Sequence, residues 1–171
     1  MRLDARAYLI LAAVASAAML AAAHAFERFG GLPPCPLCLR QREVYWIALT
    51  AALLGLFVLR READAPRRLP LLLAVVFLVG AGVAGFHAGV EWKWWEAPAS
   101  CAGAGPASAA AMEALLRGES VRFVRCDEAP WSLFGLSMAG WNALASLGLA
   151  ALGVLASQGG LRRRGLEAVH A

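Results

Sequence analysis

Residues 33–42 read Pro33-Pro34-Cys35-Pro36-Leu37-Cys38-Leu39-Arg40-Gln41-Arg42 and join a C-x-x-C pair to the start of a long apolar run. Proline suits the first turn of a helix, so a helix is predicted to begin close to Pro36. Cys38 would then lie near a helix N-terminus, where unpaired N–H groups and the macrodipole favour a thiolate. Arg42 lies four residues later, on the same helix face. A stabilised thiolate is what thiol–disulfide exchange needs, so the stretch indicates redox chemistry.

Three other uses of a C-x-x-C pair have to be weighed: zinc binding, haem attachment and a static disulfide. Haem attachment needs a histidine after the second cysteine, and this chain has Leu39 there. Zinc needs a second close pair of ligands, whereas Cys101 and Cys126 are far apart in sequence. No metal site is therefore predicted, and the inert disulfide remains as an alternative.

The composition indicates a membrane protein. Of the 171 residues, 60% are apolar, and the charges gather in a few short stretches between long uncharged ones. The basic residues flank the apolar runs and form no stripe interleaved with polar positions, so membrane topology explains them better than nucleic-acid binding.

Four apolar stretches predict an all-α membrane protein, a four-transmembrane-helix bundle formed by residues 1–171 as a single integral membrane domain. The spans are expected at about 7–26, 42–59, 69–90 and 135–156. Ala23-His24-Ala25 resembles a signal-peptidase site, so a cleaved signal sequence is the rival interpretation of the first stretch, although its length favours a retained helix. The third stretch carries small residues that let helices approach closely, namely Gly80, Gly82, Gly85 and Gly89.

Two outer loops are expected, at about 27–41 and 91–133. The second loop contains Cys101 and Cys126 and a short amphipathic stretch, which we interpret as a helix lying on the bilayer surface or as an ordinary loop helix. Its apolar face has Met112, Leu115 and Leu116, and Glu113 and Arg117 can pair across one turn.

The distribution of arginine orients the bundle. One side collects an almost unopposed set of basic residues: Arg2, Arg6, Arg60, Arg61, Arg67, Arg68, Arg162, Arg163 and Arg164. The positive-inside rule therefore puts both termini in the cytoplasm and all four cysteines on the outer, oxidising face.

Two cysteine pairs on the outer face suggest electron relay by thiol–disulfide exchange. Static bridges usually brace small secreted domains, whereas a helix bundle is held by packing in lipid. Cys101 lies in a loop of small residues, so a partner is expected to reach the Cys101–Cys126 pair. The chain shows no dinucleotide fingerprint and no haem site, so a quinone in the bilayer is the natural acceptor. Arg42 would stabilise a Cys38 thiolate or a quinone oxygen that gains charge, or would simply snorkel to the interface.

The stretch from Cys35 to Arg42, the four spans and the later Cys101 and Cys126 resemble the bacterial disulfide-bond formation protein B (DsbB) family over nearly the whole chain. The resemblance implies a multi-pass protein-disulfide oxidase of the bacterial inner membrane. Such a dithiol:quinone oxidoreductase reoxidises a periplasmic thioredoxin-fold, DsbA-like partner and passes the electrons to ubiquinone or menaquinone.

The resemblance also implies a role for each cysteine. Cys101 and Cys126 form the disulfide that meets the partner, whose thiolate attacks Cys101. The released Cys126 then attacks Cys35, and Cys38 leaves as a thiolate beside the quinone, with Arg42 near the quinone.

Several polar residues receive weaker assignments. In some relatives a glutamate precedes the arginine; here that residue is Gln41, to which no acid–base role is assigned. His87 and Glu91 share a face at the outer end of the third span, where they would deliver protons to a reduced quinone, border its site, or only be solvated at the interface. Ser137 and Asn142 are expected to form hydrogen bonds between helices.

Two other functions are kept as alternatives. A membrane scaffold would use both pairs as structural disulfides. A thiol-driven quinone reductase similar to vitamin K epoxide reductase would also use four helices and a C-x-x-C, but in that family the motif falls late in the chain.

Overall fold

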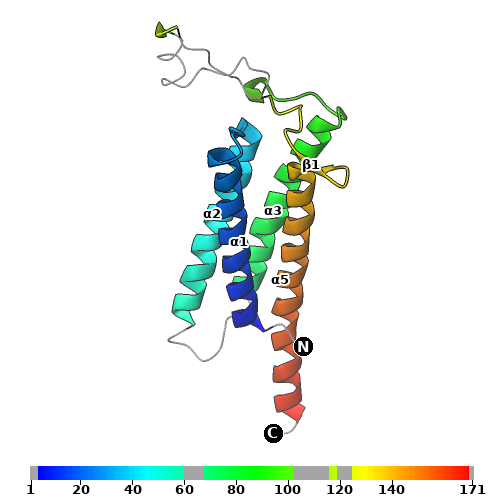
Figure 1. Cartoon of the computed structure of the whole chain (residues 1–171). Helices are drawn as coiled ribbons and strands as arrows, with labels where there is room; N and C mark the ends of the chain where they lie inside the picture. The colour runs from blue at the N-terminus through cyan, green and yellow to red at the C-terminus, as the bar shows by residue number, and fades with distance from the viewer. Residues whose placement is uncertain (1–3, 60–67, 102–115, 119–124, 170–171) are drawn as a thin grey trace.

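The structure is a computed structural model that describes residues 4–59, 68–101, 116–118 and 125–169, with side chains as far as residue 158. In this part of the chain four long helices run along one another (Figure 1): α1 (Ala5–Arg28), α2 (Pro36–Val58), α3 (Arg68–Glu91) and α5 (Met138–Val169). Both termini lie at one end of the bundle, and the short helix η1 (Ala99–Cys101) lies at the other.

Local sequence explains where two of the helices begin. Asp4 caps α1, and its carboxylate accepts a hydrogen bond from the backbone N–H of Ala7 at 2.7 Å. Cys35 caps α2, and its Sγ accepts from the backbone N–H of Cys38 at 3.2 Å. Pro36 is the first residue of α2, which confirms the predicted helix start.

The core lies along the axis of the bundle. α1 packs on α2, α2 on α3 and α3 on α5. The buried centre is built from aromatic, aliphatic and small side chains: Tyr8, Leu9, Ala12, Ala48, Ala52, Phe77 and Leu149. Alanines at this centre let the helix backbones come close, as small residues do in membrane bundles.

The glycines of α3 play different parts. A Cβ on Gly80 would lie 2.9 Å from Cγ1 of Val44, so this glycine allows the predicted close approach of α3 to α2. Gly89 is covered by the Trp95 ring, and a Cβ at this position would clash with Cζ2 of that ring. Gly82 and Gly85 face open space, so the prediction of close helix contact was wrong for these two.

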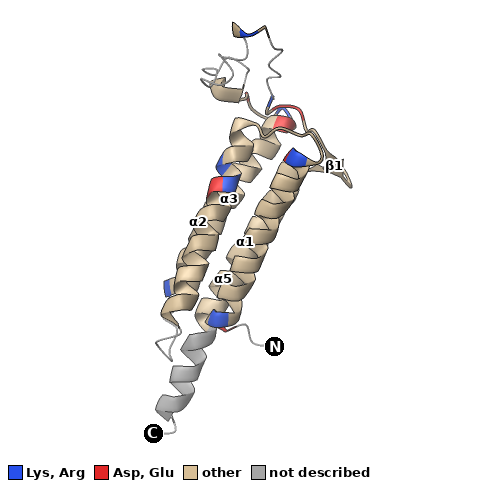
Figure 2. Ribbon diagram, turned by 60° about the vertical axis from the view of Figure 1, so that its left-hand side comes forward, with Lys and Arg blue, Asp and Glu red and all other residues tan. Residues whose placement is uncertain are grey.

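The outside of the bundle is apolar. Val14, Leu54, Leu72 and Leu155 are 62%, 61%, 62% and 58% exposed, on four different helices. A soluble monomer rarely exposes so much aliphatic surface, whereas lipid accepts it. Figure 2 shows charged residues near the ends of the helices and almost none along their middle.

Three of the helices are long and apolar enough to cross a membrane: α1, α3 and residues Met138–Gln158 of α5. The fourth long helix, α2, carries Arg40, Arg42 and Glu43 in its first turns. Its uncharged part, residues 44–58, is about 22 Å long at 1.5 Å per residue, shorter than a hydrocarbon core of about 30 Å. The charged start of α2 therefore belongs at the level of the membrane surface.

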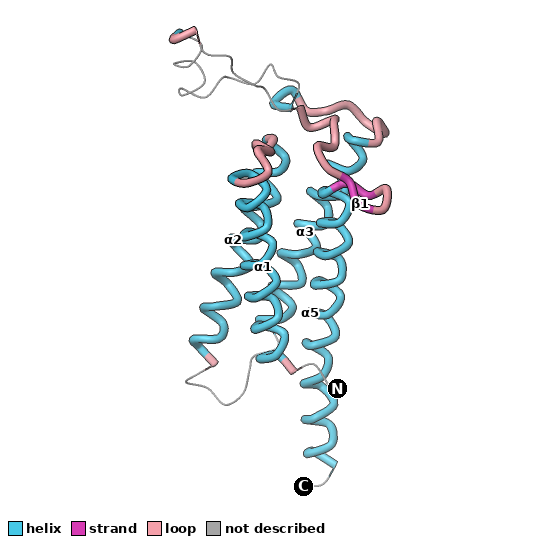
Figure 3. Tube along the Cα trace, in the orientation of Figure 1, coloured by secondary structure: helices cyan, strands magenta, loops and turns pink. Residues whose placement is uncertain are grey.

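A hairpin precedes the last helix (Figure 3). Strands β1 (Ser132–Leu133) and β2 (Leu136–Ser137) pair antiparallel, and Phe134 and Gly135 form the turn with positive φ angles of 52° and 77°. The fourth helix consequently begins at Met138, three residues later than the predicted span.

Some expectations fall outside the described residues. Most of the predicted amphipathic helix, including Met112, Glu113 and Leu115, is among them, and so are four basic residues used for orientation: Arg2, Arg60, Arg61 and Arg67.

Candidate redox site

All four cysteines meet in one apolar cluster at the η1 end of the bundle. Cys35, Cys101 and Cys126 are buried in it together with Val90, and Cys38 packs against them. Cys101 and Cys126 form a disulfide across a Cα–Cα distance of 5.3 Å. Cys35 and Cys38 are free thiols whose Sγ atoms lie 2.7 Å apart. The fold thus places a bonded pair beside a free pair, the arrangement that disulfide exchange requires.

The accessibility of the cysteines differs from the expectation. The loop of small residues around Cys101 predicted a pair open to a partner, yet Cys101 and Cys126 are 1% and 0% exposed. The reason is that Val90, Leu37 and Ala97 pack around these sulfurs. Cys38 alone of the four retains exposed surface, and it lies at the charged start of α2.

His87 lies beside the free pair. Its Nε2 is 3.7 Å from Sγ of Cys35 and 3.8 Å from Oε1 of Glu91. The backbone carbonyl of Cys126 also interacts with the ring, and Ser137 contacts Glu91. The side chains of His87 and Glu91 are only 5% and 4% exposed, so solvation at the interface does not describe them.

The imidazole is also held from its other edge, by residues that were not predicted as site residues. Gln41 Nε2 lies 2.8 Å from His87 Nδ1, and Asn142 donates to the amide oxygen of Gln41. Asn142 in turn accepts from Tyr45, so the predicted role of Asn142 as a bond between helices is confirmed. The available signal was spacing: polar residues recur four apart in apolar helices, at 41 and 45 and again at 142 and 146.

Arg42 is directed toward α1. Its Nη1 donates to Oε2 of Glu27 at 2.5 Å, and its Nη2 donates to the carbonyl oxygen of Ala23 at 3.1 Å. The Arg42 side chain is 15% exposed. Its two hydrogen bonds join α2 to α1. Both Arg42 and Glu91 are close enough to Cys38 to act on it electrostatically.

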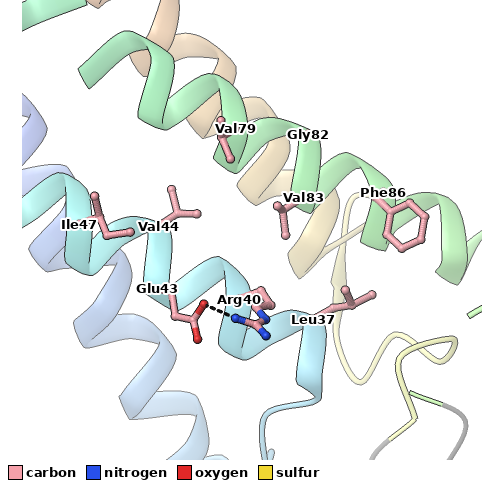
Figure 4. A pocket seen from close by; sticks show the side chains of 9 residues that line it. All are labelled: Leu37, Arg40, Glu43, Val44, Ile47, Val79, Gly82, Val83 and Phe86. Atoms are coloured by element: carbon pink, nitrogen blue, oxygen red, sulfur yellow. Dashed lines mark hydrogen bonds and ion pairs between the residues drawn. The ribbon is translucent and has the colours of Figure 1, made fainter. Parts of the chain in front are cut away.

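A groove of about 480 Å³ runs between α2 and α3 (Figure 4). Its lining is apolar apart from the Arg40–Glu43 ion pair at 3.0 Å, and Leu37, next to Cys38, forms one end. Arg42 does not line it, so the groove and Arg42 occupy different faces of α2.

The segment that carries Cys126 is anchored by charge. Asp127 accepts from Lys93 at 2.6 Å and from Arg125 at 2.7 and 2.9 Å. These two cations hold the pKa of the Asp127 carboxyl well below its usual range, chiefly through the Arg125 hydrogen bonds and then through that of Lys93.

A metal ion is the remaining candidate occupant. In the described residues, Sγ of Cys35, Sγ of Cys38 and a ring nitrogen of His87 all lie within 4.8 Å of one another. The sequence argued against zinc because no second ligand pair lies nearby along the chain, but the fold supplies an imidazole from α3. Metal analysis after mild purification tests this hypothesis, and a protein free of zinc would remove it.

Comparison with known proteins identifies the family of the chain. A family model described as disulfide bond formation protein DsbB matches residues 5–156. The chain belongs to the DsbB family. The match begins at the first residue of α1 and ends within α5, so it includes all four cysteines and every side chain of the site.

Curated relatives named disulfide bond formation protein B give the same result for this DsbB-family chain. The protein from Methylococcus capsulatus is 31% identical over 157 residues, which cover 89% of this chain and 93% of the relative. The protein from Xanthomonas campestris is 31% identical over 94% of this chain and 92% of its own length. The protein from Stutzerimonas stutzeri is 33% identical over 85% of this chain and 90% of its own length. No solved structure matches the chain.

Proposed function

We propose that the two cysteine pairs act in series, Cys101–Cys126 taking electrons from a DsbA-like partner and Cys35–Cys38 passing them to a membrane quinone. As a DsbB-family protein the chain is a disulfide-forming oxidoreductase of the bacterial membrane that reoxidises DsbA. The observation that carries the proposed order is the single cluster in which a disulfide and a free dithiol lie together.

Each exchange step conserves electrons. A partner thiolate attacks Cys101, and the Cys101–Cys126 bond breaks with its electron pair on Cys126. The Cys126 thiolate then attacks Cys35 of the oxidised Cys35–Cys38 pair, and that bond breaks with its electron pair on Cys38.

The residues near Cys38 fit a lipid-borne acceptor. Cys38 is the one cysteine with exposed surface, Arg42 lies one helical turn away, and the apolar groove ends at its neighbour Leu37. Ubiquinone or menaquinone, when bound, supplies the two-electron acceptor. Cys38 and Arg42 would hold its head group, and His87 and Glu91 would border the site. Arg42 enters this role with its charge partly balanced by Glu27.

The proposed orientation has both termini in the cytoplasm and the cysteines in the periplasm. Support comes from the termini lying at the end of the bundle opposite the cysteine cluster. A membrane-impermeant maleimide should label a single-cysteine variant that retains Cys38 from outside the cell. Labelling that requires membrane disruption would contradict the orientation.

The decisive experiment measures oxidation of a reduced thioredoxin-fold partner by membranes that contain the protein. Oxidation should need quinone and should stop in quinone-stripped membranes until quinone is returned. Equal activity without quinone would reject the proposal. A Cys126→Ser variant should trap the partner as a mixed disulfide on Cys101, and Cys101→Ser serves as the matched control that traps nothing at that position.

The scaffold alternative makes a different prediction. Structural disulfides typically have reduction potentials below about −300 mV, whereas a relay needs pairs that exchange with its partners. Two potentials below that value would favour the scaffold.

A further inference from the structure

A chain of buried polar side chains crosses the bundle and ends at the cysteines. It runs from Tyr45 to Asn142, from Asn142 to Gln41, and from Gln41 to His87. Gln41, Asn142 and His87 are 9%, 6% and 4% exposed. A buried polar group without a hydrogen-bond partner is destabilising, so each of these groups has to form a hydrogen bond with its neighbour. In each bond one group donates and the other accepts.

The hydrogen bonds have one consistent direction. In the structure Oδ1 of Asn142 faces the hydroxyls of Tyr45 and Ser146, and Nδ2 of Asn142 faces Oε1 of Gln41 and donates to it. Gln41 therefore presents its NH₂ group to His87 Nδ1. An NH₂ group can only donate, so Nδ1 has to be the unprotonated ring nitrogen, and a neutral ring then carries its proton on Nε2.

The Nε2–H edge faces the reacting atoms. Cys35 Sγ lies 3.7 Å from Nε2, Glu91 Oε1 lies 3.8 Å from it, and the Cys126 carbonyl interacts with the ring. Glu91 Oε2 has no hydrogen-bond partner among the described residues. Among described residues, the titratable groups around the ring are Cys35, Cys38 and Glu91, whereas β2 presents Ser137 and α5 presents Asn142 here.

We propose that Gln41 and Asn142 are positioning residues that hold His87 as the Nε2–H tautomer, and that His87 is a catalytic residue that donates a hydrogen bond to the Cys35 sulfur. The donor acts after the second thiolate of the partner has displaced Cys101 from the mixed disulfide, when the Cys101 thiolate attacks Cys126 in the Cys35–Cys126 disulfide. The Cys101–Cys126 bond forms, the Cys35–Cys126 bond breaks, and the electron pair stays on Cys35. His87 stabilises this thiolate and keeps its own proton. This catalytic consequence rests on the proposed function, whereas the tautomer does not.

The tautomer is tested directly by nitrogen NMR of the full chain in detergent, labelled with ¹⁵N-histidine. The His87 signals are assigned as those lost in His87→Asn. We expect one protonated nitrogen, at Nε2, and an unprotonated Nδ1. Protonation at Nδ1 in the wild-type protein would overturn the inference.

Gln41→Glu is the sharpest variant because it keeps the shape of the side chain. Asn142 can still donate to the carboxylate, but the atom facing Nδ1 becomes an acceptor. We expect Nδ1 to become protonated. Asn142→Leu removes the donor that orients Gln41, and a mixture of tautomers should appear. An unchanged tautomer in Gln41→Glu would refute the positioning role, even if Asn142→Leu fails to fold.

Two matched controls lie on the same helices. Thr50 of α2 is exposed and Ser157 of α5 is half-buried, and within the described part of the chain each donates to a backbone carbonyl of its own helix. Thr50→Ala and Ser157→Ala should therefore leave the His87 signals unchanged. A change of tautomer in either control would show that the ring responds to general disturbance and would overturn the assignment to Gln41 and Asn142.

The effect on Cys35 is measured as the equilibrium of the Cys35–Cys38 pair with glutathione, in a Cys101→Ser/Cys126→Ser chain without quinone or partner. His87→Asn should shift this equilibrium severalfold toward the disulfide, because the hydrogen bond from Nε2 to the Cys35 sulfur is lost from the reduced form. An unchanged equilibrium would remove the catalytic role. If tautomer and equilibrium behave as expected but the membranes do not oxidise a partner, the proposed function fails and the assignment of the tautomer stands.

Discussion

Arg42 of α2 donates a hydrogen bond to Glu27 of α1, with Nη1 and Oε2 only 2.5 Å apart. A second bond from Arg42 to the Ala23 carbonyl makes the guanidinium a brace between the two helices. The cation that acts electrostatically on the half-buried Cys38 is therefore held in place before any acceptor arrives. Preorganised charge of this kind is effective because it needs no rearrangement when the reaction begins.

Arg42→Ala should weaken the binding of quinone and leave the binding of the reduced partner unchanged. Loss of a charge-assisted contact predicts an increase of about tenfold in the apparent KM for quinone, with the KM for the reduced partner unchanged. Steady-state oxidation at varied quinone concentrations measures the effect. Thr50→Ala is the control, because Thr50 lies on the same helix, is exposed, and donates to the backbone carbonyl of Trp46. An unchanged KM for quinone would show that Arg42 is only a brace.

Cys38→Ser should abolish turnover, because no thiolate then remains to pass electrons to the acceptor. Any absorbance that arises from a thiolate–quinone contact should disappear with it. The Cys101–Cys126 pair should still accept a partner, so a mixed disulfide should still form. Measurable turnover by this variant would show that electrons leave from another cysteine.

The contacts of Asp127 with Lys93 and Arg125 predict that the stability of the segment that carries Cys126 depends on pH. Its pKa is depressed in the folded protein, so its stabilising contribution is present above the unfolded pKa of about 3.9 and declines as the pH falls from there toward the folded pKa. Below about pH 4 the contacts with Lys93 and Arg125 should weaken, and Cys126 should become easier to reach.

A phosphine reductant that works in acid measures this change as the rate of reduction of Cys101–Cys126. The wild-type rate should rise as the pH falls below about 4. Asp127→Asn should react rapidly at every pH, and Glu128→Gln, at a residue whose side chain is 70% exposed, is the control. Equal pH dependence in the wild type and in Asp127→Asn would contradict the anchoring role.

Gly153→Ala should destabilise the bundle. A Cβ at this position would lie 2.5 Å from the Tyr8 hydroxyl oxygen and 2.9 Å from Cβ of Ala74. Tyr8 also donates to the Leu149 carbonyl at 3.0 Å, so it cannot move without losing that bond. Overpacking of this kind costs about 1–3 kcal/mol and should lower the Tm in detergent. Gly148→Ala, with open space around its Cβ, should leave the Tm nearly unchanged.

Features decided by residues close together in the sequence could be predicted, whereas features decided by contacts between distant segments could not. The start of α2 at Pro36 was predictable because proline and an N-cap act within one turn. The hairpin at residues 132–137 was not predicted, since two-residue strands leave almost no periodic pattern. The burial of Cys101 was also missed. The small residues beside Cys101 in the sequence do not indicate that it packs in one buried cluster with Val90 of α3.

The sequence by itself determined the helical, membrane-embedded class, the four cysteines that carry the chemistry and the likeness to the DsbB family, because hydropathy and motif spacing are local properties of the chain. Only the tertiary structure decided that His87 meets Cys35, that Gln41 and Asn142 hold His87, and that Arg42 pairs with Glu27. The physical reason is that α2 and α3 are apolar on nearly every side, so their patterns do not indicate how each helix is rotated about its axis. That rotation is decided by close packing at positions such as Gly80 and by the buried hydrogen bonds themselves.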